Sequence, residues 1–261
     1  LRSYECSTSA FPVGAFLLIS LELWQKHTLE IRQVRDAVSA VFHTLLLHRS
    51  MGKFNFKSEN NYQVGSIGVE EVDCDSIDLT YVRVNSSKLV SYVQTEVDTF
   101  CYDLEKAVEL PSTSRNLTSF PSCPYGVPLC STKISLEFFQ RRKRQWLMPE
   151  EEVPWEVWQL QLDIVSITEN EYFTRMKEIV ADSLSDIVLS TCGAINKPQY
   201  MPKIPTRSEL MKVFDDSFPD CQPYLFRITK PTLGDRSDSA GLLGNLNFRS
   251  VKRLLKDTLS V

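Results

Sequence analysis

The sequence has few histidines, and their spacing does not suit a metal ion. It contains three, His27, His43 and His48, and the last two lie five residues apart within one predicted helix. A zinc-binding pair on a helix needs a spacing that places both side chains on one face, such as i and i+4. The acidic segment 73–78 lacks the glycine and the terminal glutamate of a calcium loop. We therefore expect no metal and no cofactor.

Glycine is also scarce, with nine residues in 261. The sequence has no glycine-rich loop that could cradle a phosphate and no G-x-S-x-G motif, so nothing indicates a kinase or a hydrolase. We expect a protein that is not an enzyme. An enzyme with an unrecognised site stays open as an alternative, because its usual mark is perturbed polar groups that converge in a folded cleft.

Neither sign of charge dominates. The sequence has 29 basic and 33 acidic side chains, which gives a net charge of -4. A general nucleic-acid binder collects phosphate with a positive field. Nucleic acid is therefore not an expected partner.

Long apolar runs and cysteine motifs are missing as well. The apolar stretch 11–23 is shorter than the roughly 20 residues that a membrane-spanning helix needs, so we expect no integral membrane segment and assign its second half to a first strand. A signal peptide remains the alternative, although only Arg2 precedes the stretch and no small-residue cleavage site follows it. The seven cysteines include no C-x-x-C pair and indicate reduced thiols, but Cys123 and Cys130 could pair in a secreted protein.

The sequence does contain a globular composition, with 43% hydrophobic residues, and the pattern of three long helices. Apolar residues recur every three or four positions over 33–49, 87–109 and 170–191. In the third helix they spread over about 180°, against about 100° for an ordinary surface helix. Either its own chain covers this helix on two sides, or one flank binds a partner protein. The candidate partner-facing residues are Tyr172, Phe173, Met176, Ile179 and Val180.

Strands and one shorter helix separate the long helices. Alternating apolar residues predict strands at 77–81, 134–138, 158–164 and 224–228. Thr206 and Glu209 form the capping-box pattern that begins a short helix. The proline- and serine-rich segment 110–132 predicts a surface loop. Strands and helices interleaved without regular βαβ spacing favour an α+β fold in a single domain.

One tryptophan fits none of these patterns. Trp146 follows the basic run 141–144 and precedes Pro149 and three glutamates, whereas a packed strand or helix needs regularly spaced apolar neighbours. We expect a partner to receive it. The basic run itself is expected to be a solvated strand end, since the glutamates offset its field over a Debye length of roughly 8 Å. A nuclear localisation patch and a site for anionic lipid stay open.

Seven segments of the sequence resemble the autophagy-related protein 101 family. They occur in the family's order over most of residues 30–229 and again at the extreme C-terminus, and they are too long and too many to reflect shared composition. The segments are HTLLLHRSMGKF (43–54), DCDSIDLTYVRV (73–84), SLEFFQRRKRQW (135–146), VPWEVW (153–158), PKIPTRSELMKVFD (202–215), QPYLFRI (222–228) and KDTLSV (256–261).

This resemblance implies a HORMA domain, which is an α+β fold with a mostly antiparallel sheet backed by three main helices, over residues 23–261. Family members are non-enzymatic adaptors of the Unc-51-like kinase complex, which starts autophagy in the cytoplasm at the phagophore assembly site. They pair with the HORMA domain of autophagy-related protein 13 and stabilise it. A HORMA-like adaptor of a meiotic or checkpoint pathway is the alternative. It would have a mobile C-terminal segment, whereas the autophagy family implies a docked one through 256–261.

The resemblance also implies a role for the unusual tryptophan. The family carries a projecting Trp-Pro-Phe loop, the WF finger, which recruits downstream autophagy factors. On this sequence the finger falls at Trp146, Leu147 and Met148, so only the tryptophan is kept. Loss of the proline removes a φ restraint, and methionine is a more flexible apolar contact than an aromatic ring. Trp146 is thus expected to carry more of the interaction. The N-terminal extension 1–22, the loop insertion 110–132 and the loop 230–249 diverge from the family and receive no function.

Overall fold

The computed structural model describes residues 19–22, 27–59, 61–109, 126–143, 149–195 and 202–231. The chain divides into two compact units, residues 1–230 and 231–261. Apart from Pro231, the second unit lies outside the described residues. The divergent loop 230–249, except for its first two residues, and the expected docked segment 256–261 therefore lie outside them too.

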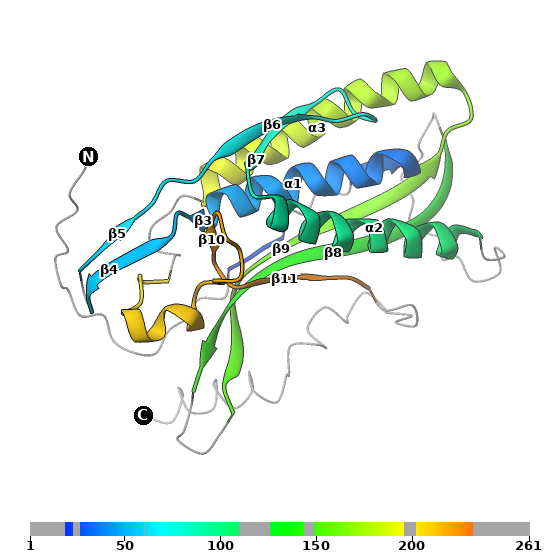
Figure 1. The fold of residues 1–261 in the computed structure, drawn as a ribbon. Helices are drawn as coiled ribbons and strands as arrows, with labels where there is room; N and C mark the ends of the chain where they lie inside the picture. Colours follow the sequence, from blue (N-terminus) through cyan, green and yellow to red (C-terminus); the bar gives the residue numbers. More distant parts are fainter. Residues whose placement is uncertain are drawn as a thin grey trace. The chain divides into compact units, whose positions relative to one another are not determined.

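Within the described part of the first unit, five strands form one sheet (Figure 1). Its two longest strands, β8 (Val127–Arg142) and β9 (Glu151–Ser166), form an antiparallel hairpin. β11 (Phe226–Thr229) pairs antiparallel with β8. β1 (Ile19–Glu22) and β2 (His27–Glu30) pair in parallel with successive parts of β9. The expected first strand at the end of 11–23 is confirmed by β1.

The remaining described strands form three two-stranded ribbons: β3 (Ser50–Met51) with β10 (Gln222–Pro223), β4 (Phe54–Ser58) with β5 (Asn61–Val64), and β6 (Val69–Asp73) with β7 (Thr80–Val84). Only glycine fits at position 52, because a Cβ there would lie 2.0 Å from the backbone carbonyl oxygen of Gly65. The predicted strand from residue 77 begins only at Thr80. The backbone amide and hydroxyl of Ser76 donate to the Asp36 carboxylate, at 2.7 and 2.5 Å, in the bend that precedes it.

The three predicted long helices are confirmed as α1 (Val34–His48), α2 (Ser87–Glu109) and α3 (Asn170–Ile195), with the one-turn η1 (Ile31–Gln33) before α1. Helix α1 lies between α2 and α3 and contacts both (Figure 1). Its predicted apolar stripe is fully buried and belongs to one hydrophobic core together with the sheet. The predicted faces at 134–138 and 158–164 are buried in that same core: Ile134, Leu136, Phe138, Trp158, Leu160, Leu162 and Ile164. The α+β fold follows from these layers.

One local prediction was wrong, and two were confirmed with a difference in detail. Residues 127–132, assigned to the surface loop, form the start of β8 because they pair with 162–166 of β9 and pack Leu129 on the core; residues 110–125 lie outside the described part. The short helix is the 3-10 helix η4 (Arg207–Lys212), and Thr206 does not cap it with its side chain. The Glu209 amide donates instead to the Thr206 carbonyl at 3.0 Å. The strand predicted from residue 224 begins at Phe226.

Candidate interaction surfaces

The outer part of the β8–β9 hairpin extends past the third strand that flanks it. β11 pairs with β8 over residues 135–138, and beyond them β8 and β9 pair with each other as far as Arg142 and Glu151. We call residues 139–143 and 149–154 the arm, which projects from the sheet in Figure 1. The connection 144–148 joins its two ends and lies outside the described residues. It contains the predicted finger, Trp146, Leu147 and Met148.

A β-bulge separates the arm from the sheet. Phe138 lies opposite Glu156, but Phe139 lies opposite Pro154, so Trp155 is the extra residue on β9. The Trp155 side chain is buried, and its ring centre lies 5.9 Å from that of Phe138 in a tilted contact. The base of the arm is therefore packed on the core face of the sheet.

Charged side chains connect the arm to the opposite face of the sheet. Arg227 of β11 donates from Nε to Glu137 of β8 at 2.9 Å and from Nη1 to Glu152 of the arm at 3.0 Å. Glu152 also lies 3.7 Å from Nε of Arg141. These side chains, other than Glu137, are more than 40% exposed. The basic run thus begins at the end of β8, where Arg141 is exposed as expected for a solvated strand end, and the pairing places glutamates of β9 opposite Arg141 and Arg142.

A second ion pair, between Arg49 and Glu156, lies inside the core at 1% and 2% exposure. Arg49 donates from Nη2 to Oε2 of Glu156 at 2.7 Å, and also to the carbonyl oxygen of Ile195 at 2.9 Å. The indole of Trp158 donates to the other carboxylate oxygen. Because Arg49 follows α1 and Ile195 ends α3, the pair joins the C-terminal ends of two helices to β9.

Helix α3 exposes part of the flank that the sequence predicted to face a partner. Tyr172 and Ile179 are 39% and 44% exposed, and their spacing of seven places them on one side of the helix. Met176 and Val180 are buried in the chain's own core. Phe173 is half-buried beneath an arginine of η1, whose Cζ lies 4.0 Å from the ring centre. The exposed candidates in the predicted flank are therefore Tyr172 and Ile179.

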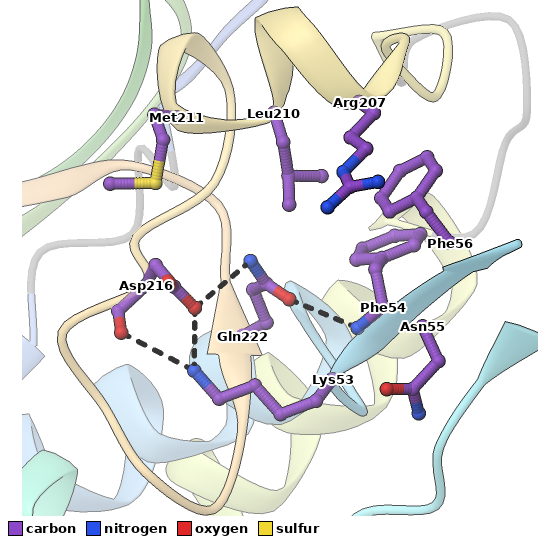
Figure 2. Close-up of a pocket in the computed structure, with 9 residues that line it drawn as sticks. All are labelled: Lys53, Phe54, Asn55, Phe56, Arg207, Leu210, Met211, Asp216 and Gln222. Carbon is purple, nitrogen blue, oxygen red and sulfur yellow. Dashed lines mark hydrogen bonds and ion pairs between the residues drawn. The ribbon is translucent and has the colours of Figure 1, made fainter. Parts of the chain in front are cut away.

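A groove of about 430 Å³ opens between β4 and η4 (Figure 2). Its polar floor is internally bonded, because Lys53 Nζ lies 2.8 Å from Oδ1 of Asp216 and the Phe54 amide donates to Gln222 at 3.2 Å. Its remaining walls are Asn55, Phe56, Arg207, Leu210 and Met211. Such a groove has room for an apolar side chain, and no sequence pattern predicted it.

The histidines occupy three separate environments. His43 stacks on Tyr81 with ring centres 5.9 Å apart, and burial together with the charge of Arg83 lowers its pKa to about 4. His27 Nδ1 lies 2.9 Å from the hydroxyl of Ser183, and burial lowers its pKa. His48 lies 3.3 Å from the sulfur of Cys192. Within the described residues no three His, Cys, Asp or Glu side chains form a group that could hold a metal ion.

The five cysteines that the structure describes form no disulfide: Cys74, Cys101, Cys130, Cys192 and Cys221. The possible partner of Cys130, Cys123, lies outside the described residues. In that described part, no helix has the length and apolarity to cross a membrane.

These features define an α+β protein whose candidate sites are surfaces for other molecules: a projecting arm, an exposed helix flank and an open groove. Comparison with known proteins gives the family. The family model for autophagy-related protein 101 matches residues 26–208. Autophagy-related protein 101 of Xenopus tropicalis is 38% identical over 235 residues, and that of Homo sapiens is 36% identical over 234; each alignment covers 90% of this chain and 95% of the relative. The chain belongs to the autophagy-related protein 101 family, and its role is therefore in autophagy.

Sequence reasoning missed the buried ion pair, although a signal for it was present. The predicted buried face of β9 includes Trp158 and Leu160, and counting back by two reaches Glu156 on the same face. A carboxylate at a buried strand position needs a cation or several donors. No local pattern identified Arg49 as that cation, because 107 residues separate the two.

Proposed function

We propose that this protein is a non-enzymatic adaptor in autophagy initiation. It pairs with and stabilises the HORMA domain of autophagy-related protein 13, and it recruits downstream factors through Trp146. In this proposal residues 23–261 form a HORMA domain, and the protein acts in the cytoplasm at the phagophore assembly site as a subunit of the Unc-51-like kinase complex. Membership of the family supports this over a meiotic or checkpoint adaptor.

The observation that carries the recruitment half is the position of Trp146 in the chain. It belongs to the connection between the two ends of the arm, and the arm extends beyond the flanking strand β11. In this proposal its aromatic side chain fills a pocket of another protein. Aromatic side chains of this kind dominate the energy of many interfaces.

Trp146→Ala tests the recruitment half. Truncation of an interface tryptophan costs about 2 to 4 kcal/mol of binding free energy, so recruitment of downstream factors should be lost. The complex with autophagy-related protein 13 and its melting temperature should not change. Met148→Ala is the matched control and should weaken recruitment less. A large fall in melting temperature for Trp146→Ala would instead place this side chain in the core and contradict the proposal.

The pairing half rests on the exposed part of α3. We propose that Tyr172 and Ile179 face autophagy-related protein 13. Co-purification of the two proteins from the same organism should give a stable one-to-one complex, and Ile179→Asp should abolish it while the free chain stays folded. Tyr102→Asp, at an exposed aromatic position on α2, is the control and should still pair. Failure of the unmodified chain to associate at micromolar concentration would contradict the pairing.

A further inference from the structure

We propose that Arg227 is a positioning residue that sets the direction in which the arm leaves the sheet. It does so by bonding Glu137 on the sheet side of the bulge and Glu152 on the arm side. The inference deepens the proposed function and rests on it, because the arm matters for recruitment only if the connection at its end carries the recruiting side chain.

Arg227 is fixed in the sheet by its partner on the neighbouring strand. It lies directly opposite Glu137 in the β11–β8 register, so its bond to Glu137 is a cross-strand pair. The hydroxyl of Thr229 donates to the other oxygen of this carboxylate at 3.1 Å. Glu137 is thus held by two side chains of β11, and it in turn fixes the guanidinium.

The guanidinium of Arg227 spans the bulge. Its planar group offers several donors in a fixed arrangement, and Nη1 reaches Glu152 at 3.0 Å. Its Cζ also lies 5.3 Å from the ring centre of Phe139, the first residue beyond the bulge on β8. The same carboxylate lies 3.7 Å from Nε of Arg141, which is itself part of the arm. Among the described ion pairs, those of Arg227 join the arm to the sheet.

The arm needs this connection to the sheet. A bulge bends its strand and interrupts the ladder. One backbone bond supports the start of the arm, from the Phe139 amide to the Leu225 carbonyl at 2.9 Å. Beyond it β8 and β9 pair with each other as a two-stranded ribbon, and such ribbons are strongly twisted and marginally stable on their own. On the core face the ring of Trp155 packs against Phe138. Alternation along β8 places Glu137 on the opposite face from Phe138, so Arg227 restrains the face that Trp155 does not.

The direction of the arm can be measured without any partner. Spin labels at the exposed positions Lys143 and Thr99, introduced as unnatural amino acids because the chain has free cysteines, report the distance from arm to helix. The unmodified chain should give one narrow distance distribution. Arg227→Gln and Glu152→Gln should broaden it, and Arg227→Lys should too, because an ammonium cannot reproduce the fork geometry. An unchanged width for Arg227→Gln would overturn the proposal.

Two matched variants separate positioning from simple loss of an ion pair. Arg83→Gln removes the cross-strand pair with Glu70 in the β6–β7 ribbon, at 2.7 Å, and should leave the distribution narrow. The exchange of Glu137→Arg with Arg227→Glu restores the β11–β8 pair but places a carboxylate near Glu152. The distance distribution of this double variant should be broad, and a narrow one would show that bridging to Glu152 is unnecessary.

The functional readout is starvation-induced autophagic flux in cells that carry only the variant protein. If about a third of arms keep the productive direction, apparent recruitment affinity falls about threefold, so Arg227→Gln should lower flux while Trp146→Ala abolishes it. If Arg227→Gln broadens the distance distribution but leaves flux normal, while Trp146→Ala abolishes flux, the positioning role is overturned. If Arg227→Gln broadens the distance distribution but Trp146→Ala keeps normal flux, Arg227 still sets the direction of the arm. That outcome contradicts the proposed function instead.

Discussion

The same chemistry holds the β8–β9 hairpin at two places, with different surroundings. The side chains of Arg49 and Glu156 are 1% and 2% exposed, whereas those of Arg227 and Glu152 are 43% and 41% exposed. Both are Arg–carboxylate pairs with short bonds, 2.7 and 3.0 Å. Burial removes water as an alternative partner, so loss of one member is costly inside and inexpensive outside. Removal of one member of the inner pair therefore destabilises the fold, whereas the outer pair restrains a direction.

Glu156→Gln should have the largest effect. It leaves the Arg49 charge buried without its counter-charge, which costs about 3 to 5 kcal/mol of unfolding free energy. Urea unfolding followed by tryptophan fluorescence measures this loss. A loss below about 1 kcal/mol would mean that water reaches the pair and that the two regions do not differ as described.

A double replacement serves as the control for that variant. Arg49→Met with Glu156→Leu removes both charges, and apolar replacement of a whole buried pair is often close to neutral. Stability should recover in large part. Recovery should be incomplete because the Ile195 carbonyl and the Trp158 indole lose their partners.

His43 extends the comparison to a buried group that stays neutral. Its pKa is about 4 in the fold and 6.5 in the unfolded chain, so between these values the unfolded state binds more protons. Its contribution is fully present above pH 6.5 and is lost as pH falls toward 4, by about 2 to 3 kcal/mol. Unfolding free energies measured across this window should fall less steeply in His43→Phe, which keeps a ring beside Tyr81. Equal slopes in the two proteins would show that His43 is already solvated.

The sequence predicted the elements whose signal is periodic. The stripe of α1 and the alternating faces of β8 and β9 are local consequences of burial on one side, so the three helices and the long hairpin followed from spacing alone. The start of β8 was missed because prolines near 121–128 indicate a loop, yet Pro128 lies beside a register irregularity where a strand tolerates it. The short helix after Thr206 was predicted, but its expected side-chain cap does not form, because backbone and side-chain caps share one sequence pattern.

Long-range contacts explain what the sequence did not predict about the candidate sites. The pairing of Arg49 with Glu156 joins residues 107 positions apart, and Arg227 lies 75 positions from Glu152. Charged residues of this kind have the same appearance in a sequence whether they end buried, bridged or free. The α3 flank was identified by its width, but which of its residues are exposed depends on the neighbours that α1 and β2 supply.

Arg227→Gln should have the smallest effect on stability and therefore gives the sharpest form of the comparison. Exposed pairs contribute at most about 1 kcal/mol, and salt screens them while buried pairs are screened much less. The stability difference between Arg227→Gln and the unmodified chain should vanish at high salt, whereas the deficit of Glu156→Gln should persist there. Urea unfolding of the three proteins at low and high salt tests both statements together. If the two deficits responded equally to salt, exposure would not be what separates the pair in the core from the pair at the base of the arm.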